Sequence, residues 1–338
     1  MLSIIIVNYR TWQFIERNLD NLLGSLPQDR ETDMLPFEVI VADNSPGDEG
    51  MQEFARKFPW VRIVRTEGNF GYGYAGNRGA ELARGDWLLF MNPDVVCDWQ
   101  NLQALLDAAH HNPGWHILSA PQYGISPRRL QRVFASFTGL ATYSATMRML
   151  LRLLAPSRYP EPRRDPGKIK GILGVDWVSG SLMLMSRDTF ARLGGWDEDY
   201  FLYREDEDIC RRAHQAGMKV GYFPGARFVH SHASSTRTSP ATRVLTKSET
   251  TLSTYLYLLK HEKGLSGDIL RLLMRLQTQL SLPLLELFGL LTGHSIGAME
   301  QKLLIHRRLR DYYRRVRETG IRVSDMSIAY PGNRRGRA

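Results

Sequence analysis

Cysteine is scarce in this sequence. Cys97 and Cys210 are the two cysteines among 338 residues, too few for a disulfide framework or a structural zinc site. We therefore expect a protein of a reducing compartment. Residues 1–7 run directly into an apolar strand, without the basic start, long apolar stretch and cleavage site of a secretion signal. The chain is thus expected to stay in the cytoplasm.

Long uninterrupted apolar runs are also missing. The apolar stretch within residues 264–338 contains Arg275, Pro283 and Glu286, whereas a helix needs about 20 consecutive apolar residues to cross a bilayer. We expect this stretch not to cross a membrane, and Pro283 to end a helix before Leu284–Leu291. The apolar residues before Pro283 share one helical face, and they are Ile269, Leu272, Leu273, Leu276 and Leu280.

Positive charge is concentrated at the C-terminus. The formal net charge is +9, and residues 294–338 hold eleven Lys or Arg residues against four Asp or Glu residues. A basic tail beside an apolar helical face suits an anionic membrane surface. The same face would also suit packing on the catalytic domain or on a second subunit in a homo-oligomer. We expect no nucleic-acid partner, because stacking platforms in this tail are limited to Tyr312, Tyr313 and Tyr330.

Short apolar runs alternate with segments of helical period in the first hundred residues. The runs are Ser3–Val7, Phe37–Ala42, Val61–Val64 and Trp87–Met91. Continuous apolar runs of this length are typical of strands buried on both faces, and repeated strand–helix units predict a parallel, doubly wound α/β sheet. Ligands of such sheets bind at the carboxyl ends of the strands.

Polar residues follow each of these four runs. They are Asn8-Tyr9-Arg10, Asp43-Asn44-Ser45, Gly68–Gly71 and Asn92-Pro93-Asp94. Each set alone is typical of a turn, but four sets at strand ends predict a ligand site. Asn92 and Asp94 could hold a hard divalent cation that bridges to a diphosphate. His230 and His232 follow a later strand, and an imidazole ligand favours manganese over magnesium.

Residues 122–170 interrupt the regular pattern. They are rich in proline around the apolar segment Phe134–Leu154, and we interpret them as a variable insertion with an amphipathic helix. Further strands are then expected at Ser181–Met185 and Val220–Phe223, and helices after about residue 241. This organisation predicts a catalytic domain at residues 1–240 and a helical, basic extension at residues 241–338.

Four consecutive acids occupy positions 205–208. Carboxylates in a first helical turn are stabilised by the helix dipole, which explains one or two of them. Four adjacent carboxylates also repel one another, which raises the pKa of one of them as a general base requires. The aromatic residues around this run suit either a sugar ring or the core, and they are Trp177, Trp196, Tyr200, Phe201 and Tyr203.

Two other readings of the sequence concern different residues. Gly71, Gly73 and Gly76 spell a GxGxxG loop, which would suit a nicotinamide-dependent oxidoreductase. That loop is informative after the first strand of a fold, and here two strand–helix units precede it. The second alternative is a non-enzymatic nucleic-acid-binding protein that uses the basic tail. Both leave the acidic run without a role.

In this order, the strand-end motifs, the acidic run and His230 resemble the family-two inverting glycosyltransferases, and most closely their bacterial rhamnosyltransferase branch. Gly194-Gly195-Trp196-Asp197-Glu198 belongs to the same set of motifs. The resemblance covers about residues 2–235. It implies a glycosyltransferase-A fold, with a mostly parallel, Rossmann-like sheet that carries helices on both faces, followed here by the helical C-terminal extension.

The resemblance also implies roles for individual residues. Asp43, helped by Tyr9, would bind a pyrimidine base; Asp94 and His230 would bind Mn or Mg; and Asp206, beside Glu205, would be the catalytic base. The whole donor site comprises Tyr9, Asp43, Asn69, Gly71, Asn77, Asn92, Asp94 and Gly180. Three positions depart from the family pattern: Asn92 in place of the first carboxylate of Asp-x-Asp, Arg10 in place of a smaller or polar residue, and Ala233 in place of glycine.

The expected reaction is transfer of a sugar, rhamnose being favoured, from a nucleoside-diphosphate donor to a hydroxyl of a glycan or a polyprenyl-linked acceptor. A divalent cation would neutralise the departing diphosphate, and the acceptor oxygen would attack from the opposite face and invert the anomeric carbon. With the charge of the tail, this predicts a cytoplasmic enzyme at the inner face of the cell membrane.

Overall fold

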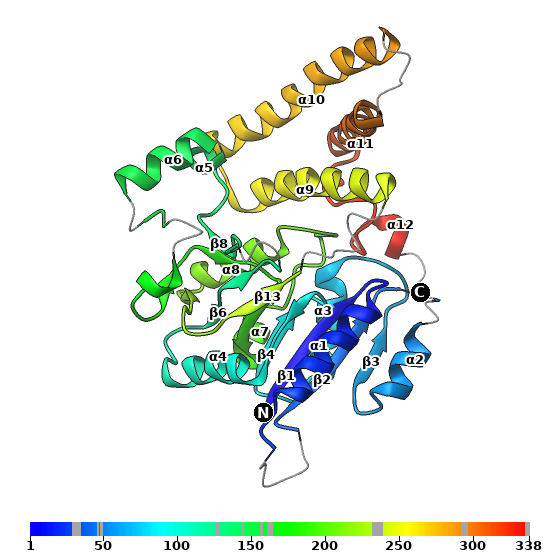
Figure 1. Cartoon of the computed structure of the whole chain (residues 1–338). Helices are drawn as coiled ribbons and strands as arrows, with labels where there is room; N and C mark the ends of the chain where they lie inside the picture. Colours follow the sequence, from blue (N-terminus) through cyan, green and yellow to red (C-terminus); the bar gives the residue numbers. More distant parts are fainter. Residues whose placement is uncertain are drawn as a thin grey trace. The chain divides into compact units, whose positions relative to one another are not determined.

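The computed structural model divides the chain into two compact units (Figure 1). It describes residues 1–28, 35–45, 47, 50–125, 129–143, 145–155, 158–160, 165–231, 239–291 and 297–334. The first unit comprises Met1–Phe137, Met149–Asp197 and Glu205–Ala233. The second comprises Thr138–Arg148, Glu198–Arg204 and Ser234–Ala338. The short segments at 138–148 and 198–204 therefore belong with the C-terminal helices.

An eight-stranded sheet forms the centre of the first unit, in the order β3-β2-β1-β4-β11-β6-β12-β9. Its strands are β1 (Leu2–Asn8), β2 (Phe37–Asp43), β3 (Arg62–Arg65), β4 (Trp87–Met91), β6 (Ile117–Ser119), β9 (Leu173–Gly174), β11 (Leu182–Ser186) and β12 (Val220–Tyr222). The first four strands pair in parallel, as the sequence predicts. Strand β11 runs antiparallel to both β4 and β6, which makes the sheet mixed.

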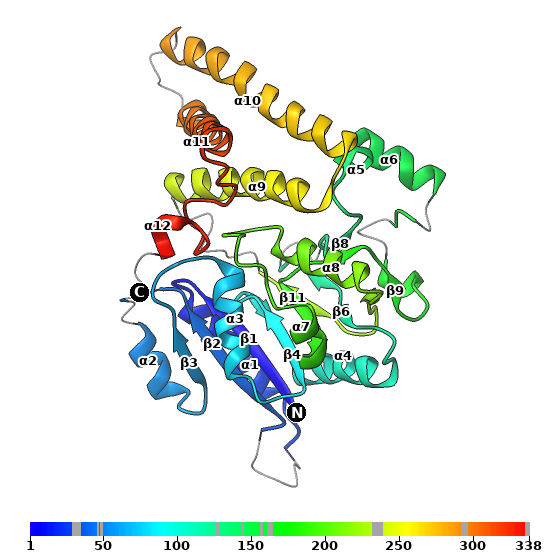
Figure 2. The same ribbon diagram turned by 180° about the vertical axis from the view of Figure 1, so that it is seen from behind.

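Helices cover both faces of this sheet (Figures 1 and 2). The helices are α1 (Trp12–Gly24), α2 (Gly50–Lys57), α3 (Tyr72–Leu82), α4 (Trp99–His111), α7 (Arg187–Arg192) and α8 (Glu205–Gln215). Alternate residues of β1 point to opposite faces of the sheet and so belong to two different cores. Ile4 packs in one core with α1, α2 and α4, whereas Ile5 packs in the other with α7 and α8. Cys97 and Cys210 are both free and buried in these cores.

Two small sheets extend the strand ends. One contains β5 (Val95–Val96), β13 (Phe228–His230) and β7 (Gln122–Tyr123), and the other pairs β8 (Phe134–Ala135) with β10 (Trp177–Val178). The apolar segment Phe134–Leu154 thus begins with a strand, because β8 pairs with β10. The helices α5 (Leu140–Tyr143) and α6 (Ala145–Leu154) follow, and the turn η1 (Pro166–Lys168) lies later in the insertion.

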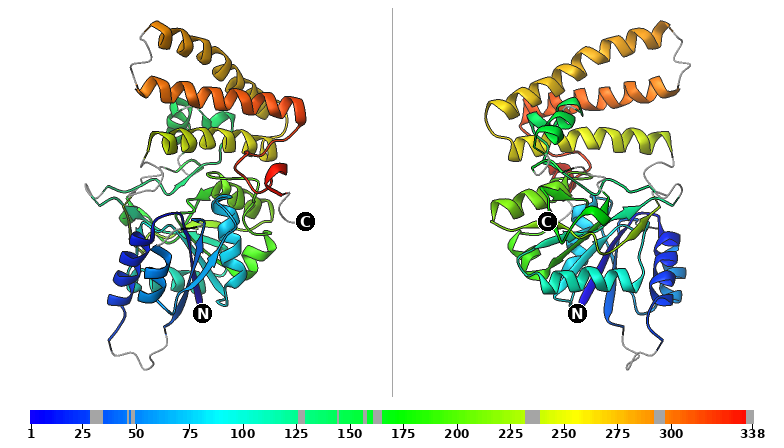
Figure 3. Two further views of the ribbon diagram at one scale, coloured as in Figure 1. Left: turned by 90° about the vertical axis from the view of Figure 1, so that its right-hand side faces the viewer. Right: turned by 60° about the vertical axis from the view of Figure 1, so that its left-hand side comes forward.

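Four helices make up most of the second unit (Figure 3). They are α9 (Pro240–His261), α10 (Leu265–Leu291), α11 (Gly297–Thr319) and α12 (Pro331–Arg334). The first three share a core that includes Leu258, Leu270 and Leu309. The expectation that Pro283 ends a helix is wrong, since it lies inside α10. Pro283 is exposed, so water can solvate the carbonyl that its missing N–H leaves unbonded.

None of the helices in the described residues is long and apolar enough to cross a membrane.

Candidate active site

The ends of β1 and β2 position a buried carboxylate. Their parallel register sets Asn8 beside Asp43, and the Asn8 amide donates to Asp43 Oδ1 at 3.0 Å. The Ser45 backbone N–H donates to the same oxygen at 2.9 Å. Asp43 Oδ2 is buried without a hydrogen-bond partner in the described part of the chain. Burial raises the pKa of Asp43 above its usual value.

Tyr9 and Arg10 follow directly after β1. The side chain of Tyr9 is 37% exposed, so a ligand can reach its ring. Arg10 has a left-handed backbone, with φ of 57°, and its N–H donates to Ser45 Oγ at 2.6 Å. This bond ties the turn after β1 to the turn after β2 and places Tyr9 and Asp43 at one edge of the sheet.

The loop before α3 joins the same edge. Gly71 caps α3 with φ of 107°, a conformation that favours glycine, and its carbonyl accepts from the Asn44 amide at 2.9 Å. Asn69 Oδ1 accepts a long bond of 3.4 Å from the Gly71 N–H. Asn77 lies farther along α3, where its amide bonds both the N–H and the carbonyl of Trp196 at 2.9 Å. Asn77 thus holds the turn at 194–197.

The glycines of α3 allow close helix packing. A Cβ atom on Gly76 would lie 2.9 Å from the indole of Trp196, and one on Gly73 would lie 3.1 Å from Trp196 Cβ. A Cβ on Gly79 would lie 2.6 Å from Ile5. Packing against Trp196 and the sheet therefore explains this glycine spacing, and the dinucleotide reading of the loop has no further support.

Asp94 and His230 meet where β5 pairs with β13. The register places His230 opposite Val95, and His230 Nε2 lies 3.3 Å from Asp94 Oδ1. Both residues are 8% exposed. The Gln131 amide donates to the His230 carbonyl at 2.8 Å and fixes the strand end. His232 and Ala233, which the sequence singled out, lie outside the described residues.

This pair has the donor chemistry that a divalent cation requires. One carboxylate oxygen and one imidazole nitrogen lie side by side, and both atoms are common ligands of Mn²⁺. Groups of three or more His, Cys, Asp or Glu residues that could hold an ion are not found among the residues that the structure describes. Within the described residues, this pair therefore offers two ligand side chains, Asp94 and His230.

The acidic run forms the first turn of α8, and its members lie in different environments. Asp206 is partly exposed, whereas Glu205, Glu207 and Asp208 are buried. Asp208 forms an ion pair of 2.7 Å with Arg212. Asp206 is thus the carboxylate of the four that solvent or a substrate reaches most readily.

Backbone donors fix the carboxylate of Asp206. Gly180 N–H donates to Asp206 Oδ2 at 3.0 Å, and Glu207 N–H donates to Oδ1 at 2.8 Å. The Tyr72 hydroxyl donates to the Gly180 carbonyl at 3.0 Å. A Cβ on Gly180 would lie 3.2 Å from Asp206 Cβ, so the glycine permits this close approach.

The Gly180–Ser181 segment connects Asp206 with the turn after β4. Gly180 bonds Asp206, and the Ser181 carbonyl accepts from the Asn92 N–H at 2.9 Å. Asn92 begins the turn that carries Asp94. The candidate base and the turn that carries Asp94 therefore flank one short segment of backbone, which leads into β11.

Sequence reasoning missed Gln122 in this region. It is fully buried on β7, where its Oε1 accepts from Ser181 Oγ at 2.9 Å, and its Nε2 has no partner among the described residues. Its position within a variable insertion gave no signal, since only the pairing of β7 with β13 brings it to the site.

The aromatic residues near the acidic run belong mostly to the core. Trp196, Tyr200 and Phe201 are each at most 3% exposed, so the alternative of stacking on a sugar ring does not hold for them. Trp177 is half-buried and donates to the Ser136 carbonyl at 3.1 Å.

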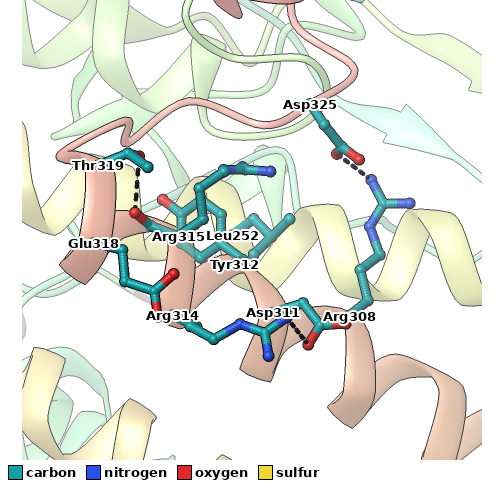
Figure 4. A pocket seen from close by; sticks show the side chains of 9 residues that line it. All are labelled: Leu252, Arg308, Asp311, Tyr312, Arg314, Arg315, Glu318, Thr319 and Asp325. Atoms are coloured by element: carbon teal, nitrogen blue, oxygen red, sulfur yellow. Dashed lines mark hydrogen bonds and ion pairs between the residues drawn. The ribbon is translucent and has the colours of Figure 1, made fainter.

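The second unit contains a cavity of about 510 Å³ (Figure 4). It is lined by Leu252, Arg308, Asp311, Tyr312, Arg314, Arg315, Glu318, Thr319 and Asp325. Its charges are balanced, and several are paired within the cavity wall: Arg308 with Asp325 at 3.0 Å and Arg314 with Asp311 at 3.2 Å. It shares no lining residue with the strand-end site.

Solved structures define the class of this fold. The structure described as GalNAc-T7 with UDP, GalNAc and Mn²⁺ matches this chain with a TM-score of 0.53 and 16% identity, over 70% of this chain and 44% of that chain. The mixed, mostly parallel sheet with helices on both faces is thus a glycosyltransferase-A fold.

Sequence comparison then gives the family. Residues 3–161 match Glycosyl transferase family 2, and residues 87–245 match Glycosyl transferase family group 2. The N-acetylglucosaminyl-diphospho-decaprenol L-rhamnosyltransferase of Mycobacterium tuberculosis is 31% identical over 78% of this chain and 86% of its own length. Rhamnosyltransferase WbbL of Escherichia coli is 26% identical, over 68% and 83%. The chain belongs to glycosyltransferase family 2 and is an enzyme of that family.

Proposed function

We propose that the enzyme transfers a sugar, rhamnose being favoured, from a nucleoside-diphosphate donor to a hydroxyl of a glycan or polyprenyl-linked acceptor. The names of the two relatives support the sugar, and the mycobacterial name supports a lipid-linked acceptor. The observation that carries the proposal is the Gly180–Ser181 segment, which bonds Asp206 on one side and the Asn92–Asp94 turn on the other.

The nucleotide binds at the ends of β1 and β2. Asp43 Oδ2, which is buried and unpartnered within the described chain, accepts a hydrogen bond from a ring N–H of the pyrimidine base. Leaving such an oxygen buried without a donor costs about 1–3 kcal/mol, so a ligand that supplies the N–H is favoured. The exposed Tyr9 ring packs beside the base.

The diphosphate lies at the end of β4. Asp94 and His230 would hold Mn²⁺ or Mg²⁺ there. When bound, the cation supplies Lewis-acid stabilisation of the charge on the leaving diphosphate. Asn69 and Gly71 border the same edge of the sheet, and Asn77 acts through the Trp196 backbone that it holds.

Asp206 is the general base of the transfer. It takes the proton of the acceptor hydroxyl while the acceptor oxygen bonds to the anomeric carbon and the bond from that carbon to the diphosphate oxygen breaks. The attack comes from the face opposite the diphosphate, so the anomeric configuration inverts. Glu205 is the runner-up for this role, but it is 8% exposed and therefore less accessible to an acceptor.

The expected location is the inner face of the cell membrane. Residues 294–338 carry an excess of seven positive charges, and each basic residue near an anionic lipid surface contributes about 1 kcal/mol. A polyprenyl-linked acceptor remains in the bilayer, which makes attachment of the enzyme to that surface useful.

The test compares Asp206→Asn with Glu205→Gln. Both enzymes are incubated with dTDP-rhamnose, Mn²⁺ and a lipid-linked N-acetylglucosaminyl acceptor, and donor binding is measured by calorimetry. We expect Asp206→Asn to lower transfer by about 10²–10⁴-fold with donor affinity unchanged. Normal turnover by Asp206→Asn together with loss by Glu205→Gln would move the base to Glu205.

The cation is tested separately. Asp94→Ala should nearly abolish transfer, and His230→Ala should raise the Mn²⁺ concentration needed for half-maximal activity, because each variant removes one ligand. Full activity of the unaltered enzyme in excess chelator would contradict the cation assignment.

A further inference from the structure

Helix α10 has apolar residues on two opposite faces. One face is buried against the core of the second unit and carries Leu270, Met274, Thr278 and Leu282, each at most 5% exposed. These residues recur at intervals of four and form a single stripe. The exposed leucines of α10 lie outside this stripe.

The opposite face is apolar but exposed. Its nine aliphatic side chains are between 36% and 76% exposed. They are Leu265, Ile269, Leu272, Leu273, Leu276, Leu280, Leu284, Leu287 and Leu290. At 3.6 residues per turn they fall within an arc of about 120°, and at 1.5 Å per residue they extend over about 38 Å. We name these nine residues the leucine face.

Charged residues of α10 lie outside the leucine face. Asp268, Arg275 and Glu286 occupy one flank, between the buried stripe and the exposed leucines, and Arg271 lies at the edge of the buried stripe. Arg271 pairs with Asp268 at 2.6 Å, and Glu286 pairs with Arg307 of α11 at 3.3 Å. A surface of this extent without charge or aromatic side chains is unusual for contact with water.

We propose that the leucine face is a membrane-docking surface, and that its partner is an anionic phospholipid bilayer. Aliphatic side chains alone suit acyl chains, whereas protein interfaces are enriched in Tyr, Trp and Arg. Because α10 is not apolar enough to span, it lies in the plane of the interface.

The charge beside α10 complements an anionic lipid surface. Helix α11 packs on α10 and exposes Lys302, Arg307, Arg310 and Arg314, within the segment that has an excess of seven positive charges. The inference rests on the proposed lipid-linked acceptor for its biological purpose, but the physical argument depends on α10 and α11 alone.

The experiment measures partition of the full chain onto vesicles of phosphatidylcholine and phosphatidylglycerol by co-sedimentation. The triple variant Leu272→Gln, Leu276→Gln, Leu280→Gln should lower the partition coefficient by at least about tenfold, because three leucines that would insert among the acyl chains are lost from the contact. The matched control is Leu150→Gln, Leu153→Gln, Leu154→Gln on α6, whose leucines are also exposed. The control should keep partition within about twofold, and added salt should weaken binding of the unaltered chain.

Three results would overturn the inference. They are unchanged partition of the α10 variant, an equal loss by the α6 control, and a dimer of the unaltered chain that the α10 variant converts to monomer. Circular dichroism and the melting temperature verify that both variants fold. Hydrolysis of dTDP-rhamnose without lipid should be equal in all three proteins. Vesicle binding by an unaltered chain that never hydrolyses or transfers from a nucleotide sugar would reject the proposed function and leave the docking surface supported.

Discussion

Two opposing influences act on the carboxyl group of Asp43. Burial raises its pKa, and the hydrogen bonds from Ser45 and Asn8 lower it by a smaller amount. The charged form is the one that accepts a hydrogen bond through both oxygens. The proposed contact with a pyrimidine N–H therefore depends on the ionisation of this residue.

Donor affinity is expected to depend on pH through Asp43. The folded pKa is raised, so as pH falls the carboxylate takes up its proton at a higher pH than an ordinary aspartate, and nucleoside-diphosphate binding weakens there. Calorimetric titrations from neutral to acidic pH measure this. Asp43→Asn should bind weakly at all pH values and lose the acidic limb, whereas Asp188→Asn, at an exposed position, should retain it. An acidic limb that persists in Asp43→Asn would assign it to another group.

The positions of Asp43, Asp94 and His230 could be predicted from the sequence because each lies at or just after the end of a strand, and strand ends gather at one edge of a sheet. The presence of Gln122 at the site, and the role of Asn77 in holding the turn at 194–197, could not be predicted from the sequence. Asn77 bonds a backbone 119 residues away, and Gln122 reaches the site through a two-residue strand. Neither contact is visible in a local sequence pattern.

The packing of α3 depends on residues without side chains. Gly76→Ala should lower the free energy of unfolding by about 1–3 kcal/mol, because the new methyl group would overlap the buried Trp196 indole. Urea unfolding monitored by tryptophan fluorescence measures the change. Gly24→Ala at the end of α1 is the control, since nothing lies within 4 Å of its added Cβ. A neutral Gly76→Ala would show that Trp196 can move aside at no cost.

Three elements of the second unit meet at Glu249. This residue of α9 is fully buried, and its carboxylate accepts from Arg308 of α11 at 2.6 Å and from Ser324 at 2.9 Å. Burial raises its pKa to about 6 despite these partners. A carboxyl group whose folded pKa exceeds its unfolded pKa binds its proton more tightly in the folded protein, so its contribution to stability is present at low pH.

The Glu249 contribution is expected to fade as pH rises from about 4.5 to about 6, with a magnitude of about 2 kcal/mol. Melting curves of the unaltered chain and of Glu249→Gln over this range test the prediction. The difference in stability between the two proteins should change with pH in that window, since glutamine does not titrate. Parallel curves would mean that Glu249 keeps an ordinary pKa.

Element boundaries were predictable where both faces of a strand are buried, as in β1, β2 and β4. The boundaries could not be predicted where strand pairing or exposure to solvent determines them. The sequence places Phe134–Ala135 in one apolar segment that continues to Leu154 and indicates no strand there, yet these two residues pair with β10. Pro283 reads as a helix end but remains within α10 because its exposed side allows solvation. The antiparallel direction of β11 is set by its neighbours rather than by its own residues.

At the scale of the whole molecule, the chain divides its apolar residues between two units. The cores around Leu89 and around Met183 lie in the first unit, and the core around Leu258 lies in the second. Helices after residue 241 were predicted from the sequence. Only the structure shows that segments 138–148 and 198–204 belong to the same unit as these helices. Packing between segments so far apart in the chain produces no periodic pattern in the sequence.

Thermal unfolding is expected to depart from two-state behaviour, because each unit has its own core. Differential scanning calorimetry should resolve two transitions. Leu258→Ala should lower the temperature of one and Leu89→Ala that of the other, since removal of a buried leucine costs about 2–5 kcal/mol. A single transition that both substitutions shift equally would show that the units unfold together.

The Gly180–Ser181 segment also restricts how this enzyme can change over evolution. Two adjacent peptide units support a group proposed to act on the acceptor and a turn proposed to act on the donor, so any replacement there alters both partners of the reaction at once. Substitutions on the two sides should show epistasis, with combined effects that differ from the sum of single effects. New sugar and acceptor preferences would then arise most readily in the loops beyond this segment, where one substrate can be altered without the other.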